Sequence, residues 1–496
     1  YLSRAGIHWS AHPTDEAVRQ EYEWVWQQLG DRPIEVLQVL PEMTDLIASG
    51  TMDVLVGLMQ PAWYSDENLR SLVIGRMVRL SIAHGNSDAS CLGYVWLSMI
   101  LGPQSGDYAL GFQFGQLGIA LAERCRQSRF KARVYQVFGG YVMQWTQPIR
   151  TARSLVRHAF DIASKFGGLT YASFARSNNL IAHLLACGDS LADVQREAEA
   201  LIRFARQAKL GLVIDQIVPQ LQLVKTLRGQ TAALGCFDDT GFHEAQFEQH
   251  LEADPRLTLP TCWYWVRKLQ SRFFSGDHAA AIDAASKAKP LLWTSPSFFE
   301  QAEYRLYAAL ALAASYGNVD PAGQGAYLQA LHAHHEQLQI WATHCPENFE
   351  NRAALVGAEI ARLGGRDTDA MRLYEDAIRS ARDNGFVHNQ ALANELAARF
   401  YAERGFEKIA RTYLQDARHG YLRWGADGKV RQLEALHPYL VEPETTRTAT
   451  TTIGTPVEHL DLATVIAISQ AVSGEIVLDK LLDTLMRIAI EQAGAQ

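Results

Sequence analysis

A short pattern of small residues recurs along the chain and constrains its fold more than any other feature. In four places a glycine is followed five residues later by Gly or Ala, at Gly106/Gly111, Gly276/Ala281, Gly365/Ala370 and Gly405/Ala410. Positions four and seven beyond the second residue are again small or apolar: Gly115 and Gly118, Ala285 and Ala288, Tyr374 and Ala377, Leu414 and Ala417. A glycine ends one helix and permits a tight turn, and a small residue lets the next helix approach its partner closely. The pattern predicts repeated helical hairpins.

The repeat has a period of about 40 residues. Ala152, Val156 and Ala159 repeat the triplet without a leading glycine, and Gly325 to Ala330 repeats its opening. Triplets begin 41 residues apart (111 to 152) and 40 apart (330 to 370 and 370 to 410). Two helices of roughly 16 residues fill such a unit. We therefore predict an all-α fold, an α-solenoid of hairpins.

The spacing Gly-x4-Ala-x3-aromatic-x2-Ala resembles the tetratricopeptide (TPR) pattern, whose usual period is about 34 residues. The longer unit favours a TPR-like array with lengthened helices, and HEAT-type hairpins are the alternative. Gly188 and Gly229 are further candidate hairpin turns. Residues 236–262, with Pro255 and Pro260, are interpreted as an irregular insertion.

Composition excludes several classes of partner. Of the 496 residues, 48% are hydrophobic and 20% are charged, and the net charge is −8. No basic field for nucleic acid or an anionic membrane is expected from such a balance. The chain has no apolar run long enough to span a bilayer, and its six cysteines are scattered, which is typical of reduced thiols. We expect a cytoplasmic protein that binds neither nucleic acid nor membrane.

The character of the sequence changes after residue 440. Residues 441–457 contain seven threonines and almost nothing to bury, so we interpret them as a linker. Residues 458–496 regain helical patterning, with an apolar face formed by Leu478, Leu481, Leu482, Leu485 and Ile488. That face needs a partner, which is either its own copy in a homodimer or a further domain.

A glycine pair near the end of the array, Gly425-Ala-Asp-Gly428-Lys429, has the look of a phosphate loop. A Walker A motif needs four residues between its glycines and Ser or Thr after the lysine. Here two residues intervene and Val430 follows, so we interpret the stretch as the turn of the final hairpin. Gly425 would end one helix, and a last helix would follow.

Metal and catalytic motifs are incomplete. His243-Glu244 and His335-Glu336 each open an H-E-x-x-H motif that lacks its second histidine. A further group is close in sequence but has no acidic second shell: His332, His334, His335, His344 and Cys345. We predict no catalytic residue, no metal ligand and no cofactor-binding residue in this segment.

One aromatic and basic stretch is a candidate interaction surface. It contains Trp263, Tyr264, Trp265, Arg267 and Lys268. These residues could form a peptide or ligand groove. The alternative, which the large burial area of aromatic rings favours for some of them, is core packing between hairpins.

Residues 345–440, which open "CPENFENRAALVGAEIARLGGRDTDAMRLYEDA", resemble the helical-repeat region of very large bacterial signalling proteins. "HGNSDASCLGYVWLSMILG", "RFKARVYQVFGG", "FEQHLEADPRLTLPTCWYWVRKLQ" and "LLWTSPSFFEQAEY" match the same region. Such proteins join a serine/threonine-kinase-like domain, an AAA/STAND ATPase, a TPR-like array, a GAF domain and a sensor histidine kinase. The resemblance implies that residues 1–440 are an array truncated at its N-terminal end and that 458–496 lead into a GAF domain.

The resemblance implies a non-catalytic regulatory scaffold in two-component signal transduction. It would recognise a protein or ligand and relay its state to a kinase output, and its partners would be proteins or neighbouring domains of the same chain. ATP and Mg²⁺ would bind only in the other domains of the parent kinase. Two alternatives are an enzyme whose active site lies within the helical array and a module that chiefly mediates dimerisation.

Overall fold

The computed structural model describes residues 1–124, 129–165 and 180–441, and the regular elements in these ranges are helices, which confirms the all-α prediction. The α-helices described in the first half are α1 (Asp15–Leu29), α2 (Leu46–Ser65), α3 (Glu67–His84), α4 (Ser90–Ser105), α5 (Tyr108–Arg124), α6 (Lys131–Val137), α7 (Ile149–Lys165), α9 (Ala182–Ala186), α10 (Leu191–Gln207) and α11 (Gly211–Leu227). Those in the second half are α12 (Glu244–Ala253), α13 (Thr258–Ser275), α14 (His278–Ala288), α15 (Glu300–Ser315), α16 (Pro321–His344), α17 (Pro346–Leu363), α18 (Asp367–Asp383), α19 (Val387–Glu403), α20 (Glu407–Trp424) and α21 (Asp427–Leu436). Shorter helical turns are η1 (Leu2–Ala5), η2 (Ile34–Val39), η3 (Phe138–Val142), η4 (Met143–Trp145), η6 (Pro255–Leu257), η7 (Lys289–Thr294), η8 (Tyr316–Asn318) and η9 (Pro438–Leu440).

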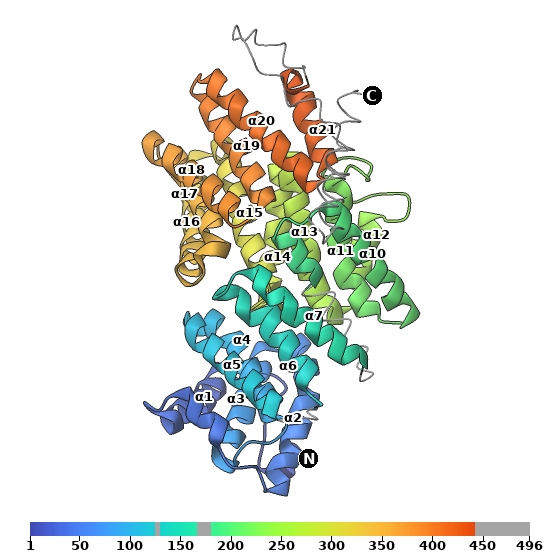
Figure 1. The fold of residues 1–496 in the computed structure, drawn as a ribbon, viewed down its shortest axis with the longest axis vertical. Coiled ribbons are helices and arrows are strands. Elements are labelled where there is room, and N and C mark those ends of the chain that lie inside the picture. The colour runs from blue at the N-terminus through green and yellow to red at the C-terminus, as the bar shows by residue number, and fades with distance from the viewer. Residues whose placement is uncertain (125–128, 166–179, 442–496) are drawn as a thin grey trace, which may run out of the picture. The chain divides into compact units, whose positions relative to one another are not determined.

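The repeated glycines are the turns of helical hairpins. The four leading glycines of the repeat have φ between +67° and +86°, a left-handed conformation that favours glycine. Each lies between two helices that pack side by side: α4 with α5, α13 with α14, α17 with α18, and α19 with α20 (Figure 1). The alanines that follow three of the turns, Ala281, Ala370 and Ala410, are buried. The sequence pattern therefore predicted these four hairpins correctly.

The predicted repeat opening at Gly325 is wrong. Helix α16 begins at Pro321 after Asp320, so Gly325 lies inside the helix rather than at a turn. Its buried stripe consists of Leu331, His334, Leu338 and Trp341. Proline is favoured in the first helical turn, where its missing N–H needs no partner. The helix therefore begins at Pro321, before the predicted turn at Gly325. The 40-residue spacing does not pass through α16 in the predicted register.

The predicted irregular insertion at 236–262 is only partly correct. It contains α12, and α13 already begins at Thr258. Pro260 lies in the first turn of α13, where the backbone tolerates proline. Two prolines in a short stretch therefore marked helix starts rather than a continuous loop.

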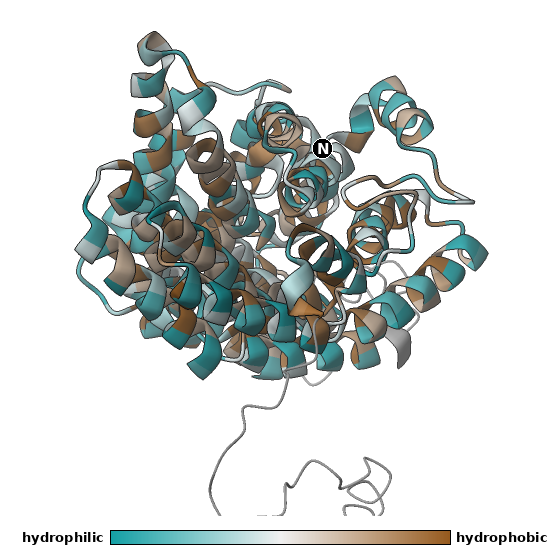
Figure 2. Ribbon diagram, turned by 90° about the horizontal axis from the view of Figure 1, so that it is seen from above, coloured by the Kyte–Doolittle hydropathy of each residue, from teal (hydrophilic) through white to brown (hydrophobic). Residues whose placement is uncertain are grey.

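Packing is not limited to neighbouring hairpins. The Asn348 side chain on α17 accepts a hydrogen bond from the Ile149 amide (3.0 Å) and donates to the Gln144 carbonyl (2.7 Å). Gly428 on α21 packs against Gly229 after α11, where a Cβ on Gly428 would lie 2.7 Å from the Gly229 nitrogen. In a simple solenoid each repeat contacts only its neighbours. Here helices some 200 residues apart in sequence are also joined by hydrogen bonds. Figure 2 shows the polar faces of the helices turned outward.

The chain divides into two compact units, residues 1–440 and residues 441–496. The predicted linker at 441–457 and the helices at 458–496 lie, apart from Val441, outside the described residues. Within the ranges that the structure covers, none of the helices combines the length and apolar character needed to cross a bilayer.

Candidate functional site

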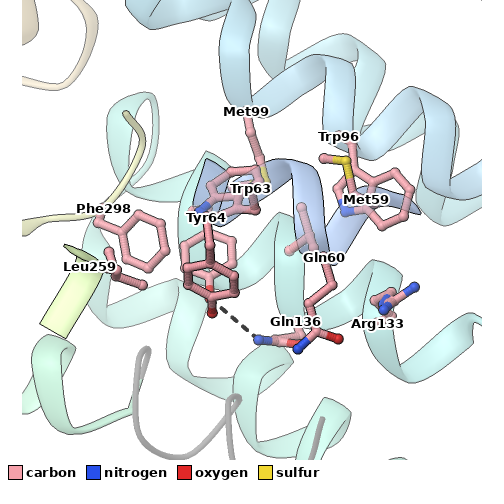
Figure 3. A pocket seen from close by; sticks show the side chains of 12 residues that line it. Met59, Gln60, Trp63, Tyr64, Trp96, Met99, Arg133, Gln136, Leu259 and Phe298 are labelled. Atoms are coloured by element: carbon pink, nitrogen blue, oxygen red, sulfur yellow. Dashed lines mark hydrogen bonds between the residues drawn. The ribbon is translucent and has the colours of Figure 1, made fainter. Parts of the chain in front are cut away.

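A cavity of about 110 Å³ lies where the N-terminal helices meet α13 and the loop before α15. We call it the aromatic pocket. Its lining residues are Met59, Gln60, Trp63 and Tyr64 from α2, Trp96 and Met99 from α4, Arg133, Gln136 and Val137 from α6, Tyr141 from η3, Leu259 from α13, and Phe298 from the loop (Figure 3). Helical spacing explains most of this set, since residues three or four apart share one face of a helix.

Phe298 is the centre of the aromatic wall. Its ring lies 4.5 Å from that of Tyr141, 6.4 Å from that of Trp63 and 5.3 Å from that of Trp263, which packs behind it. The guanidinium of Arg70 stacks over Trp63 at 4.6 Å. Phe298 and Trp63 are thus each packed on more than one side.

The loop that carries Phe298 is bonded to the N-terminal helices by its backbone. We call residues 293–298 the wedge segment. The Trp293 carbonyl accepts a hydrogen bond from Arg70 (3.2 Å), and the Thr294 carbonyl accepts one from Trp63 (3.2 Å). The Ser297 hydroxyl donates to the Met99 carbonyl. The Ser297 carbonyl also accepts from Gln144 (2.7 Å). The pocket wall is therefore shared by two parts of the sequence more than 150 residues apart.

The polar groups of the pocket gather at one end. Figure 3 shows the tips of Gln60, Gln136 and Arg133 together, away from Phe298 and Leu259. The Gln136 amide donates to the Tyr141 hydroxyl (3.3 Å, dashed in Figure 3). Burial lowers the pKa of Arg133 to about 10, so its guanidinium stays charged at neutral pH. The arrangement is amphipathic, with an apolar body and a hydrogen-bonding end.

The candidate interaction surface on α13 consists mostly of core residues. Trp263, Tyr264 and Trp265 are buried, and the rings of Tyr264 and Trp265 lie 5.1 Å apart. Trp263 donates to the Ser295 hydroxyl (3.1 Å), and the Tyr264 hydroxyl donates to Glu248 (2.5 Å). Because α13 is surrounded by other helices, these rings form no exposed groove, and the core interpretation replaces the surface one.

The two basic residues of that stretch are also paired within the protein. Arg267 is buried and forms an ion pair with the buried Glu300 (2.6 Å). Lys268 is half-buried and bonds to Glu244 (2.9 Å) and Glu248. Both cations hold α13 to its neighbours, so the proposed role in partner binding does not describe them.

The glycine loop at 425–429 is a helix boundary, as predicted, and its lysine is structural. Gly425 ends α20 with φ +83°. α21 begins at Asp427, so Gly428 and Lys429 lie inside this last helix. The buried Lys429 ammonium donates to the Phe274 carbonyl (3.0 Å), Glu395 (2.7 Å) and Gln432 (2.9 Å). All three N–H donors of the lysine have protein acceptors.

A second cavity, of about 160 Å³, lies beside Lys429 and bears on the enzyme alternative. His278, Glu395 and Arg399 also line it. Burial lowers the pKa of His278, while Glu395 accepts from both Lys429 and the Tyr421 hydroxyl (2.6 Å). Its lysine and carboxylate are bonded to each other and to the core, which favours a structural role for this cluster.

The histidines around α16 lie on different faces. His334 is buried, with its ring 5.7 Å from that of Tyr304, whereas His332 is exposed. Within the described ranges, no three His, Cys, Asp or Glu side chains gather in a way that could hold a metal ion.

Sequence reasoning did not single out the aromatic pocket. Its aromatic residues on helices fit an ordinary core pattern, and the stretch "LLWTSPSFFEQAEY", which contains Phe298, carries only the family resemblance. The pairing of α2 with the wedge segment joins residues 231 positions apart, as in the Trp63–Thr294 bond. Such a pairing leaves no periodic signal in a single sequence.

Comparison with known proteins gives a signalling context. No protein-family model matches the chain. The hybrid signal transduction histidine kinase G of Dictyostelium discoideum is 20% identical over 248 residues, which is 46% of this chain and 7% of that protein. The similarity is weak, and the chain spans a small part of the length of this relative.

Proposed function

We propose that this chain is a non-catalytic regulatory module of a sensor kinase of the two-component type, and that it binds a small ligand in the aromatic pocket. The similarity to a hybrid histidine kinase supports the signalling context. The helical-repeat fold supports a binding role, because such arrays present large surfaces for partners. In this proposal ATP, Mg²⁺ and the phosphorylated histidine belong to other domains of the same polypeptide.

The position of the pocket carries the proposal. Trp63 and Met99 come from the N-terminal helices, while Phe298 comes from the wedge segment. A ligand that contacts both sides stabilises their packed arrangement by RT ln(1 + [L]/Kd), about 2.7 kcal/mol at about 100 times Kd. Binding is thereby coupled to how the N-terminal helices pack on the rest of the array.

A route for the effect leads from the pocket to the later hairpins. The Gln144 side chain donates a hydrogen bond to the Ser297 carbonyl. The backbone carbonyl of Gln144 accepts a hydrogen bond from the Asn348 side chain on α17. Asn389 on α19 donates to Asn351 on α17 (2.8 Å). A shift of the wedge segment would change the geometry of these buried bonds, and through them the helices nearest the predicted output domains.

The lining favours binding over catalysis. Its described residues include no carboxylate, histidine or thiol that could act as a general base. Burial raises the pKa of Tyr64 to about 12, so its hydroxyl stays protonated. Protein partners, and a homodimer through residues 458–496, remain part of the proposal as further connections of the module.

Filling the pocket tests the proposed function. In the polypeptide that joins this chain to its kinase domains, Met59→Phe would occupy the cavity, whereas Met59→Leu keeps its volume. We expect Met59→Phe to change the autophosphorylation rate by about fivefold or more, the lower range of allosteric coupling, and Met59→Leu to leave it unchanged. Circular dichroism melts establish that both variants are folded. Equal kinase output from both folded variants would contradict the proposal.

A further inference from the structure

Helix α13 connects the wedge segment with the last helix of the array. Its 18 residues span about 27 Å. Near its first end, the Trp263 ring packs on that of Phe298, with 5.3 Å between the ring centres, and its indole N–H donates to the Ser295 hydroxyl (3.1 Å). Leu259, one turn earlier, is also buried. The first turns of α13 are therefore packed directly on the wedge segment.

The other end of α13 is completed by side chains of α21. The last four carbonyls of a helix have no partner within it. In α13, the first two of these accept from backbone N–H groups of the turn that follows the helix. The other two, at Phe274 and Ser275, accept from the side chains of Lys429 (3.0 Å) and Gln432 (2.7 Å). A cation at this end of a helix also interacts favourably with the helix dipole. α21 thus caps α13, although 155 residues separate Phe274 from Lys429.

α21 is too short to be stable without such contacts. It has 10 residues, and isolated helices shorter than about 12–15 residues are marginal in water. Besides its bonds to α13, Arg431 donates to the Gly229 carbonyl (3.2 Å), and Glu434 accepts from Arg418 on α20 (2.8 Å). A helix held by a few such bonds opens locally at a lower free energy than the whole protein unfolds. A small change at the end of α13 can therefore shift the docking of α21.

We infer that α21 is a latch on the C-terminal end of α13, and that the packing of the wedge segment at the opposite end of α13 controls how often this latch opens. A helix keeps its length through its backbone hydrogen bonds, so a displacement of its first turns also moves its last carbonyls. Those carbonyls are the acceptors that hold α21. In sequence, α21 is the last α-helix before residue 441. The inference goes beyond the ligand site of the proposed function, because it needs neither a ligand nor the kinase domains.

Amide hydrogen exchange of the full chain, measured by mass spectrometry, tests the latch. Trp263→Phe reduces the packing on Phe298 and removes the indole N–H that binds Ser295. We expect it to speed exchange in α21 by about fivefold or more, the lower range of allosteric coupling, and to leave exchange in α17 unchanged. Trp341→Phe on α16 is the matched control, since this buried indole also donates to a hydroxyl, that of Tyr108 (2.7 Å). It should leave α21 as protected as in the wild type.

Two further variants keep the test independent of one substitution. Ser295→Ala removes only the acceptor of the indole N–H and should speed exchange in α21 more weakly. Gln432→Ala removes the donor to the Ser275 carbonyl and should speed exchange in α21 directly. In the double variant with Trp263→Phe, the rise should be smaller than the product of the two single effects, because both changes weaken the same contact.

Three results would overturn the inference. The first is wild-type protection of α21 in folded Trp263→Phe and Ser295→Ala. The second is a rise that is equal in α17 and α21, or equally large in Trp341→Phe, since either result shows general loosening rather than transmission through α13. The third is a double variant whose effect equals the full product. Unchanged kinase output in Met59→Phe would contradict the proposed function alone and would leave the latch standing.

Discussion

Several charged side chains are buried and join different helices through ion pairs. The sequence does not show which charged residues these are. Arg267, Glu300, Glu303 and Arg352 are all buried, and Arg352 pairs with Glu303 at 3.0 Å. Charged residues are rarely buried unless paired, so composition alone would place them on polar helix faces. Their partners lie on other helices, and only the tertiary structure brings them together.

Lys429 gives a prediction at this scale. Lys429→Met removes the cation that pairs with Glu395, whose side chain is 23% exposed. Removing one partner of a buried pair costs about 3–5 kcal/mol, and partial exposure reduces this to about 2–3 kcal/mol of unfolding free energy. Urea unfolding measures the change. The exposed Lys408→Met on α20 is the control and should stay within about 0.5 kcal/mol of the wild type.

Whether the loop at residues 425–429 binds a nucleotide also depends on Lys429. Because the three donors of Lys429 already have protein acceptors, we expect no ATP binding at this loop in the wild type. ATP binding that is lost in Lys429→Met but kept in Lys408→Met would contradict this interpretation.

At the scale of elements, glycines serve two different purposes. Gly405 begins the turn before α20 with φ +80°, and open space surrounds the position of a Cβ. Gly428 lies within α21, where a Cβ would lie 2.7 Å from the Gly229 nitrogen and from the Thr226 carbonyl oxygen. The sequence pattern identified the first kind. It could not identify the second, because the close approach depends on α11.

A pair of alanine substitutions separates these purposes. Gly405→Ala should cost about 1–2 kcal/mol through backbone strain alone. Gly428→Ala should cost about 1–3 kcal/mol through overpacking and should also push α21 away from α11. Both lower the melting temperature, but only Gly428→Ala should speed amide hydrogen exchange in α21. Unchanged protection of α21 in Gly428→Ala would show that the two helices do not pack closely.

The whole molecule should be sensitive to acid because it buries neutral histidines. Burial, with Arg153 nearby, lowers the pKa of His183 to about 3. Burial, with Arg305 nearby, lowers that of His334 to about 4. The pKa of His388 is also lowered well below its ordinary value by burial. The folded state keeps these rings neutral while the unfolded state protonates near pH 6.5, so stability present above pH 6.5 is lost as pH falls toward the folded-state pKa values.

The expected effect follows from linkage. Each such histidine contributes a slope of about 1.4 kcal/mol per pH unit, fully developed between about pH 6 and pH 5. His334→Gln should make the pH dependence of the unfolding free energy shallower by that amount. His332→Gln, at an exposed position on the same helix, should not. Urea unfolding at pH 7, 6 and 5 provides the comparison, and equal slopes in all three proteins would refute the prediction.

The sequence by itself determined the helical content and the places where hairpins turn. Those properties depend on short-range physics: glycine is favoured at positive φ, and small residues at spacings of three and four allow close helix contact. Only the tertiary structure decided which hairpins meet across long distances, and so where the aromatic pocket lies. Trp63 and Phe298 come together because backbone carbonyls of the wedge segment accept hydrogen bonds from Trp63 and Arg70 of the N-terminal helices. Backbone carbonyls are present at every residue, so no amino-acid pattern marks which of them will be used.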